Sequence, residues 1–304
     1  MYTLKQIPED FIVNEITDVT FGKEGKYIYF KMKKKGYNTL DALRKIAKNL
    51  RIPISWIGIA GNKDKQAITT QFCSVKQVSK EKLEKVKLND IEIKIMGKGD
   101  LPISLGSLKG NSFEIILRKV NKKPKLKTKV LNLFGEQRFG RNNIEVGRAI
   151  IKKKFHEAAN LLGIESRRPV ENLNAINKRS LRMYIHAYQS YLWNKTVEEL
   201  VNLNIEVENV PLIGFSTKFE DKNIESIYKK IMRNENITKR DFIIRQLPEL
   251  SAEGDERKMY IDVKNLIISN LETDELNFNH KKLKLTFFLP KGCYATSFIR
   301  QLFN

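Results

Sequence analysis

The order of strand-like and helix-like segments constrains the fold of this chain more than any other feature of its sequence. Residues 1 to about 150 alternate short strand-like runs, rich in Ile, Val, Phe and Tyr, with amphipathic helical runs. From about residue 144 onward the apolar residues recur at helical spacing, and an alternating strand returns only at 281–290. A strand-rich part that resumes after a helical middle indicates one domain inserted into another.

Individual segments carry the pattern of single elements. Predicted strands lie at 10–16, 26–34, 70–78, 90–99, 111–120 and 281–290. Predicted helices lie at 38–53, 79–88, 144–162, 178–203 and 226–243, and the end of 291–304 is also helical. Thr39 and Ser79 are the expected N-caps of the first two helices. We therefore expect an α/β chain of the α+β kind, with an antiparallel or mixed sheet that helices cover on one face.

The charge balance indicates a polyanionic partner. The chain has 56 Lys and Arg against 35 Asp and Glu, which gives a net charge of +21 over 304 residues. An excess of this size favours nucleic acid, and a Lys-rich composition with well-solvated helices is the alternative. The basic segment 119–130 fits either a solvated linker or a ridge that faces RNA.

The Cys and His residues exclude several kinds of site. Cys73 and Cys293 lie far apart in the sequence, so no disulfide framework or Cys-based zinc site is expected. His156, His186 and His280 are scattered, so we expect no metal site. The sequence also lacks an apolar run of about 18 residues and an N-terminal apolar signal region, so we expect a cytoplasmic protein without a membrane segment.

One loop-like stretch, GIAGNKDKQAITTQF at 58–72, stands out from the basic strands and helices around it. It holds a single carboxylate, Asp64, between Lys63 and Lys65. The phosphate-binding pattern GxxxxGK[ST] and the dinucleotide pattern GxGxxG do not fit it. A glycosidase would need a second acidic residue, and the sequence offers no obvious one. A tight turn in which Asp64 caps backbone N–H groups remains an alternative to catalysis.

The same stretch resembles the signature of TruD-type tRNA pseudouridine synthases, G-x-A-G-x-K-D-x-x-A-x-T-x-Q. Six further blocks follow the order of that family: PEDFIVNE, KKKGYNTLDAL, LGSLKGNSFEIILR, NLFGEQRFG, NKRSLRMYIHAYQSYLWN and LPKGCYATSFIRQL. Together they cover most of the chain outside roughly 195–275. The resemblance implies a pseudouridine synthase core at 1–157 and 269–304, built on a mixed, mainly antiparallel sheet with flanking helices. A smaller α/β TRUD domain is inserted at 158–268.

The resemblance also implies an enzyme that isomerises uridine 13 in the D arm of tRNA to pseudouridine, without a metal or cofactor. The catalytic aspartate of the family falls on Asp64. A single ionised carboxylate is sufficient, because the detached uracil stays bound as an anion. Asp64 either attacks C1′ to form an ester or removes the 2′ proton to open a glycal route, and both remain open. Lys63 and Lys65 are expected to favour the ionised form and to attract phosphate.

The target uridine is expected to be extruded from the RNA, so its pocket needs a stacking face and a polar anchor. The family pattern implies that Phe134 is the stacking ring and Asn132 the polar anchor. It also implies pocket positions for Lys5, Phe11 and Tyr294. Ordinary core packing is the alternative for Phe11 and Tyr294.

Arg138 and Arg300 are further candidates for phosphate or carboxylate contacts, with surface ion pairing on helices as the alternative. Two other functions remain open: a non-catalytic RNA-binding protein of the same fold, and a pseudouridine synthase that acts on another RNA. The intact GNKD run at 61–64 argues against the first. We expect tRNA as the partner and a monomeric protein.

Overall fold

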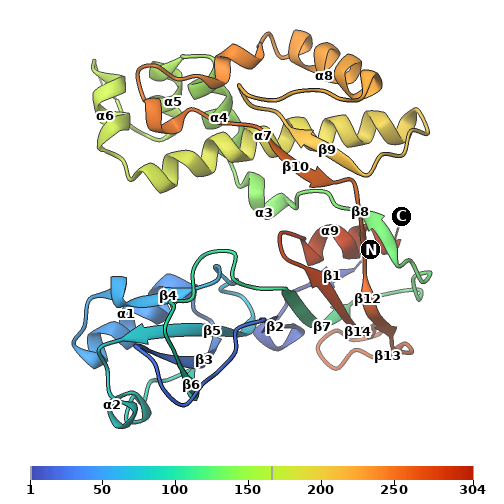
Figure 1. The fold of residues 1–304 in the computed structure, drawn as a ribbon. Helices are drawn as coiled ribbons and strands as arrows, with labels where there is room; N and C mark the ends of the chain where they lie inside the picture. Colours follow the sequence, from blue (N-terminus) through green and yellow to red (C-terminus); the bar gives the residue numbers. More distant parts are fainter. Residues whose placement is uncertain (1, 166, 304) are drawn as a thin grey trace. The chain divides into compact units, whose positions relative to one another are not determined.

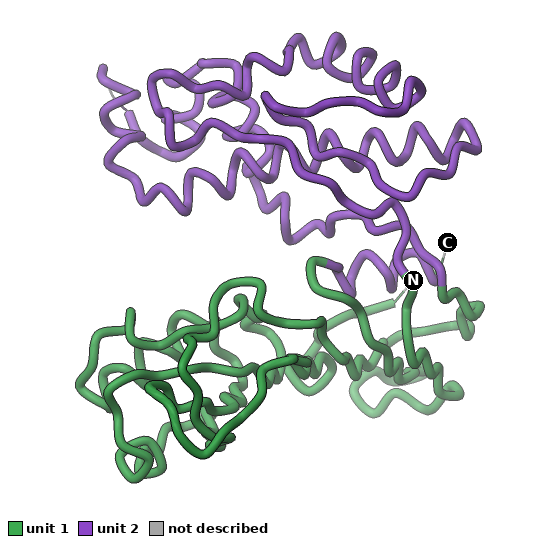
Figure 2. The backbone as a smooth tube through the Cα atoms, viewed as in Figure 1, with its two compact units in different colours: residues 1–128, 262–292, 303 green, residues 129–261, 293–302, 304 purple. Residues whose placement is uncertain are grey.

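A computed structural model of the chain describes residues 2–165 and 167–303. The backbone forms two compact units (Figures 1 and 2). Unit 1 comprises the residues up to 128, residues 262–292 and residue 303; unit 2 comprises 129–261 and 293–302. These two units are defined by the contacts within each of them. The division into a core at 1–157 and 269–304 and an insertion at 158–268 comes from the family resemblance, and it remains a prediction.

Unit 1 is built on one large sheet. Its strands are β1 (Thr3–Leu4), β2 (Phe11–Ile16), β3 (Tyr27–Lys35), β4 (Ile57–Ile59), β5 (Ile68–Lys76), β6 (Ile91–Gly99), β7 (Gly110–Arg118), β12 (Lys264–Ile268), β13 (Glu272–Thr273) and β14 (Lys281–Pro290). Their order is β12-β14-β7-β2-β5-β3-β6, with β1 on β7, β13 on β14 and β4 on β5. Within the described residues these strands pair antiparallel except for β2 and β5, which run parallel. The prediction of a mixed, mainly antiparallel sheet is confirmed.

The helices of unit 1 are α1 (Thr39–Leu50), α2 (Lys80–Glu84) and the short 3-10 helices η1 (Pro8–Asp10) and η2 (Ile54–Trp56). The apolar side of α1 packs in one core cluster with side chains of β3 and β5. Ser79 caps α2 as predicted, because its hydroxyl accepts from the N–H of Lys82. The predicted cap of α1 was wrong by one residue: Asn38 accepts from the N–H of Asp41, and Thr39 is the first helical residue.

Unit 2 is mainly helical. Its helices are α3 (Glu136–Phe139), α4 (Asn143–Ile151), α5 (Phe155–Leu161), α6 (Pro169–Ala175), α7 (Lys178–Asn202), α8 (Lys222–Asn234), η3 (Lys239–Phe242), η4 (Pro248–Leu250) and α9 (Ala295–Phe303). Two small strand pairs join β9 (Asn209–Leu212) to β10 (Asp255–Lys258) and β8 (Lys129–Leu131) to β11 (Tyr260–Asp262). Tyr188 and Trp193 of α7 are fully buried in the core, as the spacing of its aromatic residues predicted. No helix in the described ranges is long and apolar enough to cross a bilayer.

The predicted helix at 144–162 is two helices. The chain breaks between α4 and α5, where Lys153 takes a left-handed backbone conformation with φ of 60°. The Nζ of Lys153 donates to the carbonyl oxygens of Ile151 and Asp241, and these hydrogen bonds stabilise the chain where the two helices are separated. The predicted helix at 226–243 likewise ends at Asn234 and resumes only as η3.

Candidate active site

The parallel pairing of β2 with β5 brings two distant segments to one edge of the sheet in unit 1. Residues 60–67 form the connection that leads from β4 into β5, and residues 5–10 lead into β2. Because β2 and β5 run in the same direction, the segments that precede them lie at the same end. Lys5 Nζ lies 2.6 Å from Asp64 Oδ2 and 4.1 Å from the centre of the Phe11 ring. The structure thus groups three of the predicted residues.

The members of this group differ in their access to solvent. The side chain of Asp64 is 22% exposed and that of Lys5 is 18% exposed. Phe11 is only 3% exposed and its ring packs edge-on against Phe113. A cation this close favours the ionised form of a carboxylate. Asp64 is therefore a part-exposed carboxylate paired with a cation, and the Phe11 ring near it belongs to the core.

Lys5 is held in an uncommon backbone conformation. Its φ is 57°, which is the left-handed region that non-glycine residues rarely adopt. The side-chain amide of Gln66, in the same connection as Asp64, donates to the carbonyl oxygen of Lys5 at 2.6 Å. The two segments are thus joined by a backbone contact as well as by the ion pair.

Lys63 takes a different partner from the one expected. Its Nζ forms an ion pair with Glu15 in β2, and the two side chains are 7% and 0% exposed. Glu15 also accepts from the N–H of Phe72 at 3.1 Å. The structure pairs Lys63 with Glu15 and Lys5 with Asp64, so a cation of the N-terminal segment contacts Asp64 directly, and the expected influence of Lys63 and Lys65 on Asp64 stays a prediction.

The backbone around Asp64 is bound by a buried lysine that the sequence analysis did not single out. Lys34 of β3 is 1% exposed. Its Nζ lies 2.6 Å from the carbonyl oxygen of Tyr37, 2.8 Å from that of Asp64 and 3.5 Å from that of Lys63. The hydroxyl of Thr39 accepts from the N–H of Lys63 at 2.8 Å. Because Asn38 supplies the helix cap, the Thr39 side chain binds this connection instead.

The two glycines of the stretch have different surroundings. A side chain at Gly58 would lie 2.3 Å from the carbonyl oxygen of Ile103 and 2.6 Å from the hydroxyl of Ser74. At Gly61 a side chain would meet no atom within 4 Å. Position 58 therefore requires glycine, because the segment at Ile103 approaches its backbone too closely for a Cβ atom. Position 61 has room for a Cβ atom, so no close contact requires glycine there.

A second group of predicted residues lies in unit 2, where β8 leads into α3. The side chain of Asn194 in α7 accepts from the N–H of Phe134 and donates to its carbonyl oxygen, both at 3.0 Å. The Phe134 ring lies 5.6 Å from Trp193, edge-on, and 6.0 Å from Tyr294. Asn132 is 6% exposed and Phe134 is 7% exposed, whereas Tyr294 is half-buried. The structure brings Asn132, Phe134 and Tyr294 together.

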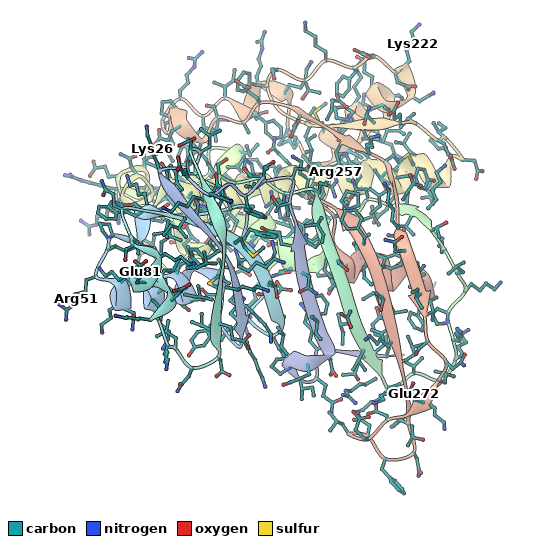
Figure 3. The ribbon with its side chains drawn as sticks, turned by 60° about the horizontal axis from the view of Figure 1, so that its bottom comes forward. Lys26, Arg51, Glu81, Lys222, Arg257 and Glu272 are labelled. Atoms are coloured by element: carbon teal, nitrogen blue, oxygen red, sulfur yellow. The ribbon has the colours of Figure 1, made fainter. Side chains whose placement is uncertain are left out.

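Arg257 of β10, labelled in Figure 3, contacts two members of this group. Its Nε and Nη2 donate to the carbonyl oxygen of Asn132 at 3.0 and 2.8 Å, and Nη2 also donates to Asn132 Oδ1 at 2.6 Å. The guanidinium carbon lies 4.0 Å from the centre of the Phe134 ring. Sequence reasoning missed Arg257 because it stands in the part of the chain outside the recognised blocks.

The remaining candidates make pairings within unit 2. Arg138 Nε donates to the hydroxyl of Ser190 at 3.3 Å. Arg300 forms an ion pair with Glu136 at 3.2 Å, in which the two side chains are 48% and 87% exposed. Such an exposed pair matches the surface alternative for Arg300. Across residues 2–165 and 167–303, no group of three or more His, Cys, Asp or Glu side chains is placed to hold a metal ion.

The sequence of the chain was compared with those of known protein families. The family described as tRNA pseudouridine synthase D (TruD) matches the chain over residues 2–172 and 206–302. The chain belongs to the TruD family. The matched ranges contain every predicted site residue and also Lys34 and Arg257. The predicted family resemblance is confirmed.

Individual TruD proteins match over almost the whole chain. A probable tRNA pseudouridine synthase D of Methanosarcina acetivorans is 29% identical, with 98% of this chain and 91% of the relative covered. A tRNA pseudouridine synthase D of Aquifex aeolicus is 28% identical, with coverages of 99% and 97%. The crystal structure of a putative TruD from Methanosarcina mazei has a TM-score of 0.77 at 25% identity and covers 99% of this chain and 93% of its own. The predicted fold class is therefore confirmed.

The burial of Lys34 predicts a pH-dependent contribution to stability. Burial lowers the pKa of Lys34 to about 8, whereas an unfolded lysine titrates near 10.5. Between these values the unfolded chain binds more protons, so stability rises with pH. In the Lys34→Met variant this rise should be missing, and wild type should gain about 2 kcal/mol over the variant between about pH 7 and pH 9.5. Urea unfolding of both proteins across this range measures the gain.

The exposed neighbour Lys33 on the same strand provides the control. Its side chain is 50% exposed and pairs with Glu92. The Lys33→Met variant should keep the pH dependence of wild type, because it leaves the buried Lys34 in place. If the unfolding free energies of Lys34→Met and wild type change with pH in the same way, Lys34 is not the group that causes the pH dependence.

Proposed function

We propose that the protein isomerises a uridine of tRNA to pseudouridine, at uridine 13 of the D arm, with Asp64 as the catalytic carboxylate and without a metal or cofactor. The observation that carries the proposal is the Asp64 side chain, 22% exposed and 2.6 Å from the ammonium of Lys5, in a chain of the TruD family. The substrate class follows from the family, and the position in the tRNA follows from the resemblance alone.

The reaction makes modest demands on protein chemistry. The bond between N1 and C1′ breaks, the uracil turns, a bond forms between C5 and C1′, and the C5 proton is lost while N1 regains one. A carboxylate helps either by bonding to C1′ or by removing the 2′ proton. Both routes need Asp64 ionised, which the adjacent Lys5 ammonium favours.

The other predicted residues are assigned to binding of the target nucleotide. We assign Asn132 as the polar anchor and Phe134 as the aromatic face, with Tyr294 beside them in unit 2. Lys5 and Phe11, which lie near Asp64 in unit 1, are also assigned to binding of the target nucleotide, and Phe11, at 3% exposed, mainly serves packing. Phe134 is 7% exposed, so most of its ring serves packing and only its exposed rim is offered to a base.

Removing the Phe134 ring should weaken the reaction. In the Phe134→Leu variant most of the buried volume stays, but base–aromatic contact is lost, which is worth about 1–3 kcal/mol in kcat/KM. Single-turnover rates at several tRNA concentrations measure the loss. The Phe219→Leu variant is the control, because Phe219 is a half-buried ring of unit 2 that packs on Tyr228. An unchanged rate for Phe134→Leu would remove Phe134 from the nucleotide site.

The proposed function is tested by mapping pseudouridine in RNA treated with the purified protein. Carbodiimide-blocked primer extension on unmodified tRNA transcripts should give a stop that reports position 13. A stop at another uridine, or only in messenger or ribosomal transcripts, would replace the proposed target. Binding of tRNA without pseudouridine in any RNA would favour the non-catalytic alternative instead.

A further inference from the structure

Arg257 binds both residues that are assigned to the target nucleotide in unit 2. The edge of its guanidinium donates to the carbonyl oxygen and to the side-chain oxygen of Asn132. The face of the same group lies against the Phe134 ring, at 4.0 Å from the ring centre, and it is 5.3 Å from the ring of Trp193. A planar cation that uses its edge for hydrogen bonds and its face for a ring is chemistry specific to arginine.

The contacts of Asn132 also fix which way its side-chain amide points. Oδ1 accepts from Arg257, and Nδ2 donates to the carbonyl oxygen of Lys258 at 3.1 Å. Turning the amide over would set its N–H donors against the Arg257 donors and its oxygen against the Lys258 carbonyl. The backbone N–H of Asn132 is bound as well, by the carbonyl oxygen of Met259 at 2.8 Å. Residues 257–259 therefore determine both the place and the orientation of Asn132.

We propose that Arg257 is a positioning residue of the uridine site, which orients the amide of Asn132 and holds the ring of Phe134 for the target nucleotide. The inference rests on the proposed function, because it requires that Asn132 and Phe134 contact a uridine. Lysine at this position keeps the charge but has neither the two coplanar N–H groups nor the flat face. Misplacement of a binding group by about 1 Å is enough to lower a rate by about 10²-fold.

The Arg257→Lys variant provides the main test, because it leaves the charge in place. We expect kcat to fall by about 10²-fold, with tRNA affinity within a few fold of wild type. The melting temperature should fall by only a few degrees, from the lost hydrogen bonds to Asn132. In the Arg257→Ala variant, added guanidinium ion should restore part of kcat, whereas ammonium ion should not. The Arg240→Ala variant is the control, because it removes the same charge from an exposed side chain of η3 in unit 2.

Three results would overturn the positioning role. A kcat of Arg257→Lys within about twofold of wild type shows that the guanidinium geometry is not needed. Restoration of Arg257→Ala by ammonium as well as guanidinium shows that only charge matters. An increase in turnover or tRNA affinity in either variant shows that Arg257 blocks the site rather than arranging it.

A double-mutant cycle separates this inference from the proposed function. The losses of unfolding free energy in Arg257→Lys and Asn132→Ala should be less than additive in the double variant, because both remove the hydrogen bond from Arg257 Nη2 to Asn132 Oδ1. Additive losses would contradict the contact whether or not the protein forms pseudouridine. If wild type forms no pseudouridine, the proposed function fails and the cycle still reports on the contact. If wild type is active and Arg257→Lys equals it, only the inference fails.

Discussion

Replacing Asp64 with Asn is expected to abolish pseudouridine formation, with turnover lowered by about 10³-fold or more. The amide has nearly the shape of the carboxylate, but it carries no charge and neither attacks C1′ nor removes a proton. The oxygen of the amide still accepts a hydrogen bond from Lys5, so the local fold should persist. Binding of tRNA should stay within a few fold, because the net charge of +21 is spread over many Lys and Arg side chains.

Three measurements on one preparation decide the role of Asp64: pseudouridine yield by primer extension, tRNA affinity by filter binding, and melting temperature. The matched control is Asp18→Asn, which removes the same charge from a carboxylate of unit 1 that is 63% exposed and pairs with Lys109. The control should keep wild-type turnover. Turnover of Asp64→Asn near that of the control would exclude Asp64 as the catalytic group.

Local patterns predicted the elements and the loop well. The alternating run at 281–290 and the helical run at 178–203 correspond to β14 and α7 almost residue for residue. Buried side chains recur every second residue from Leu283 in β14 and every three or four residues from Leu181 in α7. The helix predicted at 144–162 failed at Lys153, which has the left-handed conformation of a helix end but stands in a run of three lysines, without the glycine that usually marks such an end.

The sequence analysis singled out none of the cations Lys34, Arg118 and Arg257, of which the first two are buried and Arg257 is part-buried. Lys34 stands in the run KKK and has the composition of its exposed neighbours. Strand alternation was the available signal, because Phe30, Met32 and Lys34 occupy the same buried face of β3. Arg257 and Arg118 have no such signal: their partners lie 125 residues away for Arg257, and 108 and 156 residues away for Arg118. Ion pairs between residues so far apart in the sequence leave no periodic pattern from which they could be predicted.

Replacing Arg118 with Met is expected to cost about 3–5 kcal/mol of unfolding free energy. Arg118 of β7 is 1% exposed, and its guanidinium binds Asp10 at 2.9 Å and Asp274 at 2.8 Å. Both carboxylate side chains are 0% exposed, so the variant leaves two buried charges without their cation. Lys284→Met is the control, because it breaks the exposed pair of Lys284 with Glu114 in the same sheet and should cost at most about 1 kcal/mol.

The same network supports the segment that carries Lys5. Asp10 accepts from the N–H of Ile7 at 3.1 Å and so closes η1, directly before Phe11. Loss of Arg118 should therefore loosen the approach of Lys5 to Asp64 as well as the sheet. A triple variant that adds Asp10→Asn and Asp274→Asn to Arg118→Met removes the unpaired charges and should recover part of the stability. No recovery would mean that the loss arises from packing of the Arg118 side chain.

The advantage of wild type over Arg118→Met should also shrink in acid, because it depends on ionised carboxylates. Burial acts to raise the pKa of Asp274, but hydrogen bonds from Asn277 and Arg118 outweigh burial and the pKa is lowered. The pKa of Glu275 is lowered to about 2, first by Lys282 and then by its own backbone N–H and Arg118. A lowered pKa in the folded state gives stability that is present above the unfolded pKa, about 4, and is lost as pH falls toward 2. Urea unfolding at about pH 7 and about pH 2.5 should therefore give a smaller difference in unfolding free energy between the two proteins at the lower pH. An equal difference at both pH values would show that the contribution of Arg118 does not depend on these carboxylates.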